Sequence, residues 1–448
     1  MPEIVAALLR EIAWPFALVL AWVAGELGQR WLTLPRISSY GIVGFLLAAG
    51  QAGVLPEVRG GSMALLADVA FGLILFELGY RINLGWLRAN PWLAVTSVVE
   101  AGGCFVAVFF IAQAFSVDPV PALLLAALSM STSPAAVLRV ANELRSSGQV
   151  TERTLHLSAF NCVLAVIVFK IVVGYGLLLS DGGILQAVWS SLVVLAVSAG
   201  VGALFGVAVP ALLRVLGGVD RNATLAFAVA ILALTALTHA LKFSPLLAAL
   251  AFGIVARHRR VVLSQAQRNF GALGDLLTIL LFVFVAATID WRQAVSGAWL
   301  ALAVVAARLA VKTATTTLFA HPSGMSWRKG ALTGLALTPL SVFAILLLEQ
   351  TRHLGLGLID ELKAIMAMVL LLEVIGPVVT QRALIWAGYA DPLAPAEGMR
   401  DQDHELAGMR DFLAHWQRIA PEPLSAQALS ELIRDRLDYG GGDWRARN

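Results

Sequence analysis

Charged residues are scarce in this sequence. Of its 448 residues, 14% are charged and 59% are hydrophobic, whereas an average soluble domain carries about 25% charged residues. A soluble chain of this length would need a charged surface, so the deficit indicates a protein that is solvated by lipid. The net charge is only +3 and there is no basic run, which argues against nucleic acid as a partner.

Cysteine is also nearly absent. The two cysteines, Cys104 and Cys162, both lie in apolar stretches, which excludes a disulfide framework and a cysteine zinc site. The glycine-rich stretch 200–206 lacks the spacing of a nucleotide-binding loop. The chain does not begin with a short apolar core and a cleavage site, so we predict no cleaved signal peptide. We expect no metal, no cofactor and no enzymatic activity.

Long apolar runs, in contrast, are abundant. We predict an all-α polytopic membrane protein with thirteen transmembrane helices, most of them close to the roughly 20 residues that cross the hydrocarbon core. The segment 245–256 is too short alone, and we expect it to recruit preceding residues. The predicted spans are 12–31, 38–54, 63–79, 91–115, 120–141, 155–179, 184–213, 223–240, 245–256, 270–289, 294–319, 331–348 and 365–385.

Positive charge alternates between the predicted loops. The loops after odd-numbered spans carry 15 Lys and Arg residues, and the loops after even-numbered spans carry 5. Because Lys and Arg are retained on the cytoplasmic side, we predict an outside N-terminus and a cytoplasmic C-terminus. We expect a multi-pass protein of the bacterial inner membrane.

The sequence also contains an internal repeat. Segment 66–83 is echoed at 273–290, and Ser131-Thr132-Ser133-Pro134 is echoed by Thr338-Pro339. Equivalent spans are seven apart, an odd number, so the two halves are predicted to be inverted in the membrane. Inverted repeats place the substrate near the midplane, on broken helices.

Residues 389–448 have a different composition, rich in Asp, Glu and Arg. Apolar residues recur there at helical spacing over 406–419 and 429–437. We therefore divide the chain into a transmembrane domain, 1–388, and a cytoplasmic tail of amphipathic helices, 389–448. Such a tail can bind a cytoplasmic partner or the lipid bilayer.

Ionisable groups inside spans are costly and are therefore candidates for function. Glu77 lies near the end of its span, is followed by glycine two residues later, and can face a cation pathway. Arg308 and Lys312 lie four residues apart on one helix face and can compensate the partial charges of broken helix ends. We expect Glu26, Glu373 and Lys170 near the interfaces. Glu100 is left without a role.

The two predicted helix breaks supply oxygen atoms. Pro134 and Pro339 each interrupt a helix and free a backbone carbonyl. The hydroxyls of Thr132, Ser133 and Thr338 add further oxygens. Hard monovalent cations prefer oxygen ligands, so the breaks are candidate cation sites.

Several motifs together resemble one family. Leu75-Phe76-Glu77-Leu78-Gly79 is similar to an FE-x-G element, and Thr132-Ser133-Pro134-Ala135-Ala136-Val137 to the TDP-x-AV signature of a broken helix. Segment 158–169 is similar to an ES-x-x-ND-x-x-A-I-V-x-F signature. Over most of residues 30–388 the chain resembles the monovalent cation/proton antiporters, especially the sodium/proton exchanger branch. The resemblance implies two crossing discontinuous helices, exchange of Na⁺ or K⁺ for H⁺, and a homodimer. It also places Arg308 at the position where the family has a positively charged side chain.

The chain departs from this family at three acidic positions. Cys162 stands where the family has its ion-carrying aspartate, Leu157 where it has a glutamate, and Ser133 where the broken helix has an aspartate. Neutral sulfur is a poor ligand for a hard cation, and a thiol, whose ordinary pKa is about 8.5, is largely protonated near pH 7.

The resemblance implies an ion-binding set in which Glu77 is the one retained carboxylate. We predict that Glu77 points toward the helix crossing and takes over charge compensation and proton coupling. Alternatively, Glu77 pairs with Arg308 and leaves the site unable to bind cations. The implied set is Glu77, Thr132, Ser158, Asn161 and Cys162.

Three functions remain open on the sequence. The first is antiport of Na⁺ or K⁺ against protons by alternating access. The second is a transport-inactive sensor or interaction protein that keeps the scaffold. The third is a transporter of an anion or organic solute, suggested by the intramembrane cations and the missing acids.

Overall fold

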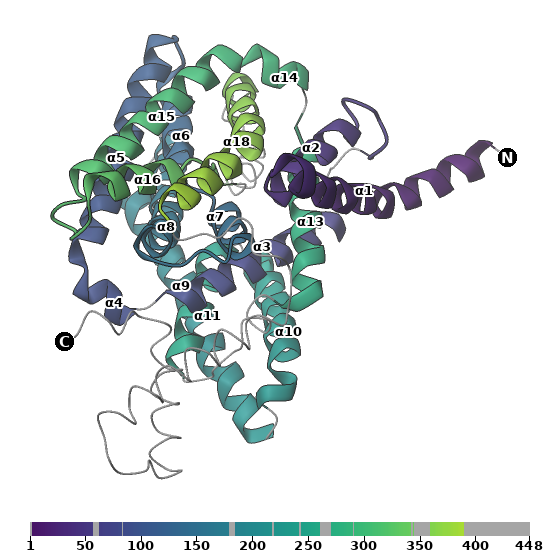
Figure 1. Ribbon diagram of the computed structural model, residues 1–448, viewed down its shortest axis with the longest axis horizontal. Coiled ribbons are helices and arrows are strands. Elements are labelled where there is room, and N and C mark those ends of the chain that lie inside the picture. Colours follow the sequence, from purple (N-terminus) through teal and green to yellow (C-terminus); the bar gives the residue numbers. More distant parts are fainter. Residues whose placement is uncertain are drawn as a thin grey trace, which may run out of the picture. The chain divides into compact units, whose positions relative to one another are not determined.

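The fold consists of α-helices throughout the part of the chain that the computed structural model describes (Figure 1). That part comprises residues 2–56, 62–82, 84–178, 184–216, 219–241, 243–259, 270–289, 291–341, 344 and 359–388. These residues belong to one compact unit, Met1–Asp391. The predicted tail, 389–448, lies outside the described residues.

Proline marks where several of the helices begin. Pro91, Pro119, Pro134 and Pro245 each occupy a first helical position, where the missing N–H costs no hydrogen bond. The helices are α1 (Pro2–Leu32), α2 (Arg36–Leu47), α3 (Ser62–Arg81), α4 (Leu84–Ala89), α5 (Pro91–Ala114), α6 (Pro119–Ser129), α7 (Pro134–Glu143), α8 (Gln149–Leu178), α9 (Ile184–Leu216), α10 (Val219–Ala240), α11 (Pro245–His258), α13 (Gly271–Ala287), α14 (Trp291–Ser296), α15 (Ala298–Leu318), α16 (Trp327–Ala336) and α18 (Ile359–Trp386).

The helices follow most of the predicted spans, and several differ. The helix α11 begins at Pro245 and extends to His258, so the expectation that the segment 245–256 recruits preceding residues was wrong. In the span predicted at 331–348, α16 ends at Ala336. Among the described residues, eight stretches are long and apolar enough to cross a membrane, and α2, α11 and α13 are shorter apolar helices. The span predicted at 38–54 is helical only to Leu47. The span predicted at 120–141 is two helices, α6 and α7, because the chain leaves the helix before Pro134. The total of thirteen spans stays a prediction.

The order of elements repeats along the chain, in agreement with the predicted repeat. Each half contains a long helix, a short six-residue helix, a second long helix and then a helix break. These elements are α3, α4, α5 and α6/α7 in the first half and α13, α14, α15 and α16 in the second.

The helices pack into two groups. The first group, called here the α5 bundle, contains α5, α6, α8, α15 and α16. The second, called the α3 bundle, contains α1, α2, α3, α9, α10, α11 and α13. The helices α7 and α18 contact members of both bundles, and α8 of the first bundle also packs against α9 of the second.

Close contact between α3 and α11 depends on glycine. A Cβ atom added at Gly253 would overlap the carbonyl oxygen of Phe76, and one added at Gly79 would overlap the carbonyl oxygen of Leu250. Both obstacles are backbone atoms, which cannot move aside as a flexible side chain can. Small residues at such crossings let two helix backbones approach closely inside a membrane.

We expect Gly253→Ala to lower stability by roughly 1–3 kcal/mol, because the added methyl group forces α3 and α11 apart. The thermal unfolding midpoint of the detergent-solubilised protein measures the change. Gly102→Ala is the matched control, because a Cβ there meets no atom within 4 Å. Equal midpoints for the two variants would contradict a glycine-dependent contact.

Candidate functional site

The two helix breaks cross and are hydrogen-bonded to each other. The first lies between Ser129, the end of α6, and Pro134, the start of α7. The second follows α16, at Leu337–Ser341. The backbone N–H of Ser133 donates to the carbonyl of Pro339 at 2.9 Å, and the Thr132 hydroxyl donates to the carbonyl of Leu337 at 3.4 Å. The predicted crossing of two discontinuous helices is therefore present.

Several hydroxyls at the breaks form hydrogen bonds with the backbone of their own segment. Ser133 caps α7, since its Oγ accepts from the N–H of Ala136 at 3.2 Å. The Ser131 hydroxyl donates to the carbonyl of Leu128 at 2.7 Å, and the Thr338 hydroxyl donates to that of Leu335 at 2.5 Å. Two break residues instead have side chains that reach neighbouring helices: Thr132, and Ser341, whose side chain is hydrogen-bonded to Cys162 on α8.

Arg308 binds the carbonyl ends of both breaks. Its side chain comes from α15 and is 1% exposed. The guanidinium donates to the carbonyls of Ser129 at 2.9 Å and Ser131 at 2.5 Å on one break. It also donates to Thr338 at 2.5 Å and Pro339 at 3.2 Å on the other. Helix C-termini carry partial negative charge. The Arg308 guanidinium compensates that charge at the carbonyl ends of both breaks.

A buried ion pair lies beside the crossing. Lys312, one turn beyond Arg308, pairs its Nζ with Oε1 of Glu100 on α5, and both side chains are 0% exposed. Nζ also donates to the Thr132 hydroxyl at 3.2 Å and to the Met130 carbonyl at 3.3 Å. An isolated buried charge is very costly, so each member of the pair needs the other.

An amide completes the coordination of the carboxylate. Asn161 on α8 donates from Nδ2 to Oε2 of Glu100 at 2.5 Å and to the Thr132 hydroxyl at 3.4 Å. The Ser97 hydroxyl donates to Oδ1 of Asn161 at 3.0 Å. Ser97, Glu100, Thr132, Asn161 and Lys312 therefore form one connected polar cluster, called here the Glu100 site.

The other predicted residues of α8 lie at the edge of this site. The Cys162 thiol donates to the carbonyl of Thr132 at 3.1 Å and is buried. The Ser158 hydroxyl is bonded to its own helix, at the Leu155 carbonyl, 2.8 Å away. The Ser158 hydroxyl is thus directed at a backbone oxygen, whereas the Cys162 thiol contacts both a backbone oxygen and the side chain of Ser341 on the second break.

Glu77 does not reach the crossing. Its Oε1 accepts from Nδ2 of Asn142 at 2.9 Å and lies 3.6 Å from the guanidinium of Arg81. Asn142 is nine residues beyond Ser133 along α7, which is about 13 Å at 1.5 Å per residue. The sequence-based expectation that Glu77 points toward Thr132 and Ser158 was wrong, and so was its alternative pairing with Arg308. Arg81, one turn beyond Glu77, and α7 bind the carboxylate instead.

The C-terminal half of α7 connects to three helices of the α3 bundle. Asn142 binds Glu77 on α3. Arg139 donates to Oδ1 of Asp275 at 3.4 Å and to the Gly274 carbonyl at 3.2 Å, both on α13. Glu143 accepts from the backbone N–H of Arg36, the first residue of α2, at 3.3 Å. This helix thus joins the crossing to the opposite bundle.

The sequence left Glu100 unassigned although it carries the central carboxylate. Its partner Lys312 is 212 residues away, so no local motif joins them. One signal was available: Thr96, Ser97, Glu100 and Cys104 form a polar stripe at helical spacing in an otherwise apolar span. No group of three or more His, Cys, Asp and Glu side chains suited to a metal occurs among the described residues.

Two crossing helix breaks beside a buried ion pair, in a helical membrane protein, define a secondary transporter of the discontinuous-helix class. The sequence model described as "Sodium/hydrogen exchanger, transmembrane" matches residues 16–386. The chain belongs to this sodium/hydrogen exchanger family, which confirms the resemblance that the motifs indicated.

Two solved structures share the fold. The sodium proton antiporter MjNhaP1 from Methanocaldococcus jannaschii at pH 8 matches with a TM-score of 0.59 at 17% identity, over 84% of this chain and 96% of that one. An electron-microscopy map of the same antiporter matches with a TM-score of 0.62 at 15% identity, over 84% of this chain and 95% of that one. No curated protein sequence matches this chain significantly.

We expect Lys312→Met to lower stability by about 3–5 kcal/mol, because it leaves the Glu100 carboxylate buried without its cation. Adding Glu100→Gln should recover a large part of this loss, because the double variant has no buried charge at the pair. Thermal unfolding of the two single variants and the double variant measures the coupling. Additive losses would contradict a direct pair.

Proposed function

We propose that this protein exchanges a monovalent cation, Na⁺ or K⁺, for protons across a membrane by alternating access, with the Glu100 site as its exchange site. The observation that carries the proposal is the buried Glu100–Lys312 pair, whose Lys312 ammonium also contacts both Thr132 and Met130 of a helix break. Membership in the sodium/hydrogen exchanger family supports the same class of activity.

The ammonium of Lys312 occupies a position that suits a metal cation. Its neighbours are oxygens: a Glu100 carboxylate oxygen, the Thr132 hydroxyl and the Met130 carbonyl. These are the ligands that a hard cation prefers. A dehydrated Na⁺ or K⁺ can therefore take the place of the ammonium beside the carboxylate.

Exchange then follows from charge balance. Glu100 is a single carboxylate and cannot neutralise two cations in a buried site. When the metal cation binds, Lys312 gives up one proton and becomes a neutral amine. When the cation leaves, Lys312 takes a proton back and pairs with Glu100 again. One cation is exchanged for one proton, and the charge of the site is unchanged.

Arg308 has a different role from Lys312 in this proposal. Its guanidinium contacts four carbonyls of the two breaks, and guanidinium stays protonated in proteins. Arg308 therefore keeps the breaks together during exchange, and Lys312 supplies the transferable proton. Charge compensation, which the sequence predicted for both residues, is thus assigned to Arg308 at the breaks and to Lys312 at the Glu100 carboxylate.

The geometry disfavours the two rival functions. Lys312 already pairs with Glu100, and Arg308 with carbonyls, so neither positive charge is available to an anion. A transport-inactive scaffold is suggested by Cys162 in place of aspartate, but Glu100 supplies a carboxylate beside the same break. The homodimer, the cytoplasmic C-terminus and a partner for the tail belong to the proposal as further expectations.

We expect Glu100→Gln to abolish cation-triggered proton movement in proteoliposomes, because no carboxylate remains to hold the cation. Glu77→Gln is the matched control: it removes an equally buried carboxylate that lies away from the crossing, and it should retain exchange. A pH-sensitive dye inside the vesicles reports proton movement when Na⁺ or K⁺ is added. Loss of exchange in Glu77→Gln with exchange retained in Glu100→Gln would refute the proposed site.

The transport-inactive alternative makes a different prediction for Cys162→Asp. If wild type moves no protons with either cation and this substitution starts exchange, the chain is a scaffold that lost its coupling acid. If the wild-type protein already exchanges cations for protons, the Glu100 site is favoured, whatever the result for Cys162→Asp.

A further inference from the structure

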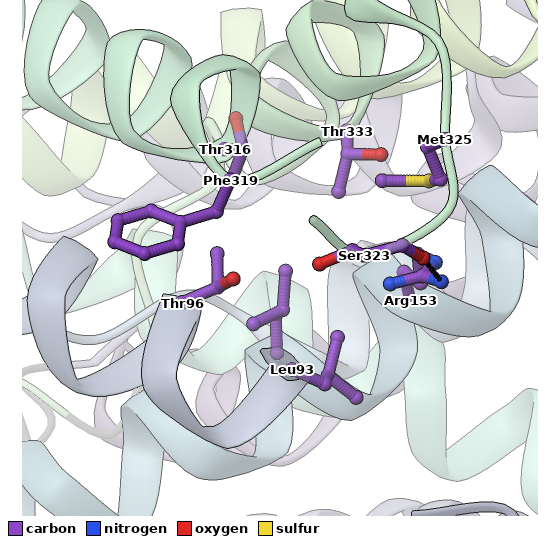
Figure 2. Close-up of a pocket in the computed structure, with 9 residues that line it drawn as sticks. Leu93, Thr96, Arg153, Thr316, Phe319, Ser323, Met325 and Thr333 are labelled. Atoms are coloured by element: carbon purple, nitrogen blue, oxygen red, sulfur yellow. Dashed lines mark hydrogen bonds between the residues drawn. The ribbon is translucent and has the colours of Figure 1, made fainter. Parts of the chain in front are cut away.

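Buried charged side chains in this protein are bound by partners, with one exception. Glu100 and Lys312 bind each other, and Figure 2 shows Arg153 beside a small cavity, where its guanidinium donates to the carbonyl of Ser323. Glu373 on α18 is also buried, 6% exposed. Its carboxyl group forms no hydrogen bond or ion pair within the described part of the chain.

Glu373 lies near the middle of an apolar span, Lys363–Trp386. The nearest charged residue of the same helix is Arg382, nine positions away, which is about 13 Å along the helix. The expectation that Glu373 lies near an interface was wrong, because neighbouring helices bury its side chain. An ionisable group in such a place is costly and is therefore a candidate for function.

The helix α2 provides the space for this carboxyl group. A Cβ atom added at Gly41 would lie 3.0 Å from Cγ and 3.9 Å from Oε1 of Glu373, so the missing side chain of Gly41 leaves room for the glutamate. One turn earlier on α2, the Ser38 hydroxyl donates to the carbonyl of Val374 at 3.0 Å. Glycine and serine of α2 thus pack on α18 at Glu373.

The same helix also packs on the second helix break. The Thr380 hydroxyl donates to the carbonyl of Ala336, the last residue of α16, at 3.0 Å. A Cβ atom added at Gly376 would lie 2.8 Å from Cα of Pro339. Residues seven apart lie on nearly the same helix face, so Glu373 shares the face of Thr380. Glu373 therefore belongs to a contact between the α3 bundle and the crossing.

The charged groups of α2 and α7 are directed away from Glu373. On α2, Arg36 pairs with Glu26, and the ring of Tyr40 lies against Gly25 of α1. On α7, Arg139 pairs with Asp275, and Glu143 accepts from the backbone N–H of Arg36.

The other helices packed against α18 are α6, α14, α15 and α16, and their charged groups are directed elsewhere too. The helix α6 has none. Arg292 of α14 lies over the ring of Trp291, and both cations of α15 are bound at the crossing. On α16, Arg328 donates to the carbonyl of Trp386 and Lys329 to Gln149. Glu373 thus has no cation to balance a negative charge in the described ranges.

We infer that Glu373 is a second proton-binding site, separate from the Glu100 site, which holds a proton while α2 packs against α18 and releases it to water when these helices separate. An ionised carboxylate buried without a partner is costly, so the group takes a proton instead. Separation exposes the carboxyl group to water, which stabilises its charged form. By linkage, a proton at Glu373 favours the packed arrangement, and its loss favours separation.

Infrared spectra of the full-length protein in lipid vesicles test for the bound proton, because a protonated carboxyl group and a carboxylate absorb at different frequencies. We expect the spectrum of wild type minus that of Glu373→Gln to contain the band of a protonated carboxyl group at neutral pH. Glu77→Gln is the matched control: it removes a buried carboxylate bound by Asn142 and Arg81, and its difference spectrum should lack this band. Absence of the band for Glu373 would overturn the inference.

Hydrogen exchange of backbone amides, read by mass spectrometry, tests the link to helix packing. The quantity is the exchange rate of α2 in wild type divided by the rate in Glu373→Gln at the same pH, which cancels the intrinsic effect of pH. We expect a ratio near one at mildly acidic pH and a several-fold rise at alkaline pH, because only wild type ionises there. The helix α10, which packs on α3, α9 and α11, is the control and should keep a ratio near one.

Two exchange patterns overturn the link between the proton and the packing. One is a ratio for α2 that is the same at every pH, and the other is an equal rise in α10, which would show general loosening. Neither measurement needs transport. The expected spectra and ratios in a protein without cation exchange would therefore refute the proposed function and leave the Glu373 site intact.

Discussion

The contact between Arg308 and four backbone carbonyls is the interaction on which the centre of this protein depends. Interrupting two helices inside a membrane leaves carbonyls that no water can satisfy. One guanidinium has enough donors in a planar fork to bind carbonyls from both breaks at once. The crossing of the breaks, and with it the position of Thr132, follows from that contact.

The ion pair next to Arg308 changes how the missing family acids are understood. Cys162 and Leu157 remove two carboxylates that the family resemblance led us to expect, yet the centre still has a buried carboxylate, Glu100, from a different helix. Glu100 brings Lys312 and Asn161 into one cluster. The loss of acid at one position is thus accompanied by an acid–base pair at another, beside the same helix break.

Much of the fold could be predicted from the sequence, because lipid imposes long apolar helices and proline marks where they break. The repeat and the crossing at Pro134 and Pro339 followed from local patterns. The placement of the acids did not. Glu77 sits in a familiar motif but is bound by Asn142 on a neighbouring helix, whereas Glu100 has no motif and finds Lys312 through tertiary packing. Side-chain pairing between distant helices has no local signature.

The position of α7 has a mechanical consequence. Its first turn is fixed to the crossing through Ser133, and its last turns are hydrogen-bonded to α2, α3 and α13. A ten-residue helix is a stiff rod about 15 Å long. A shift of a fraction of an ångström at the crossing therefore cannot be absorbed along the helix. It must appear at the far end, where the α3 bundle either moves with it or exchanges its hydrogen bonds.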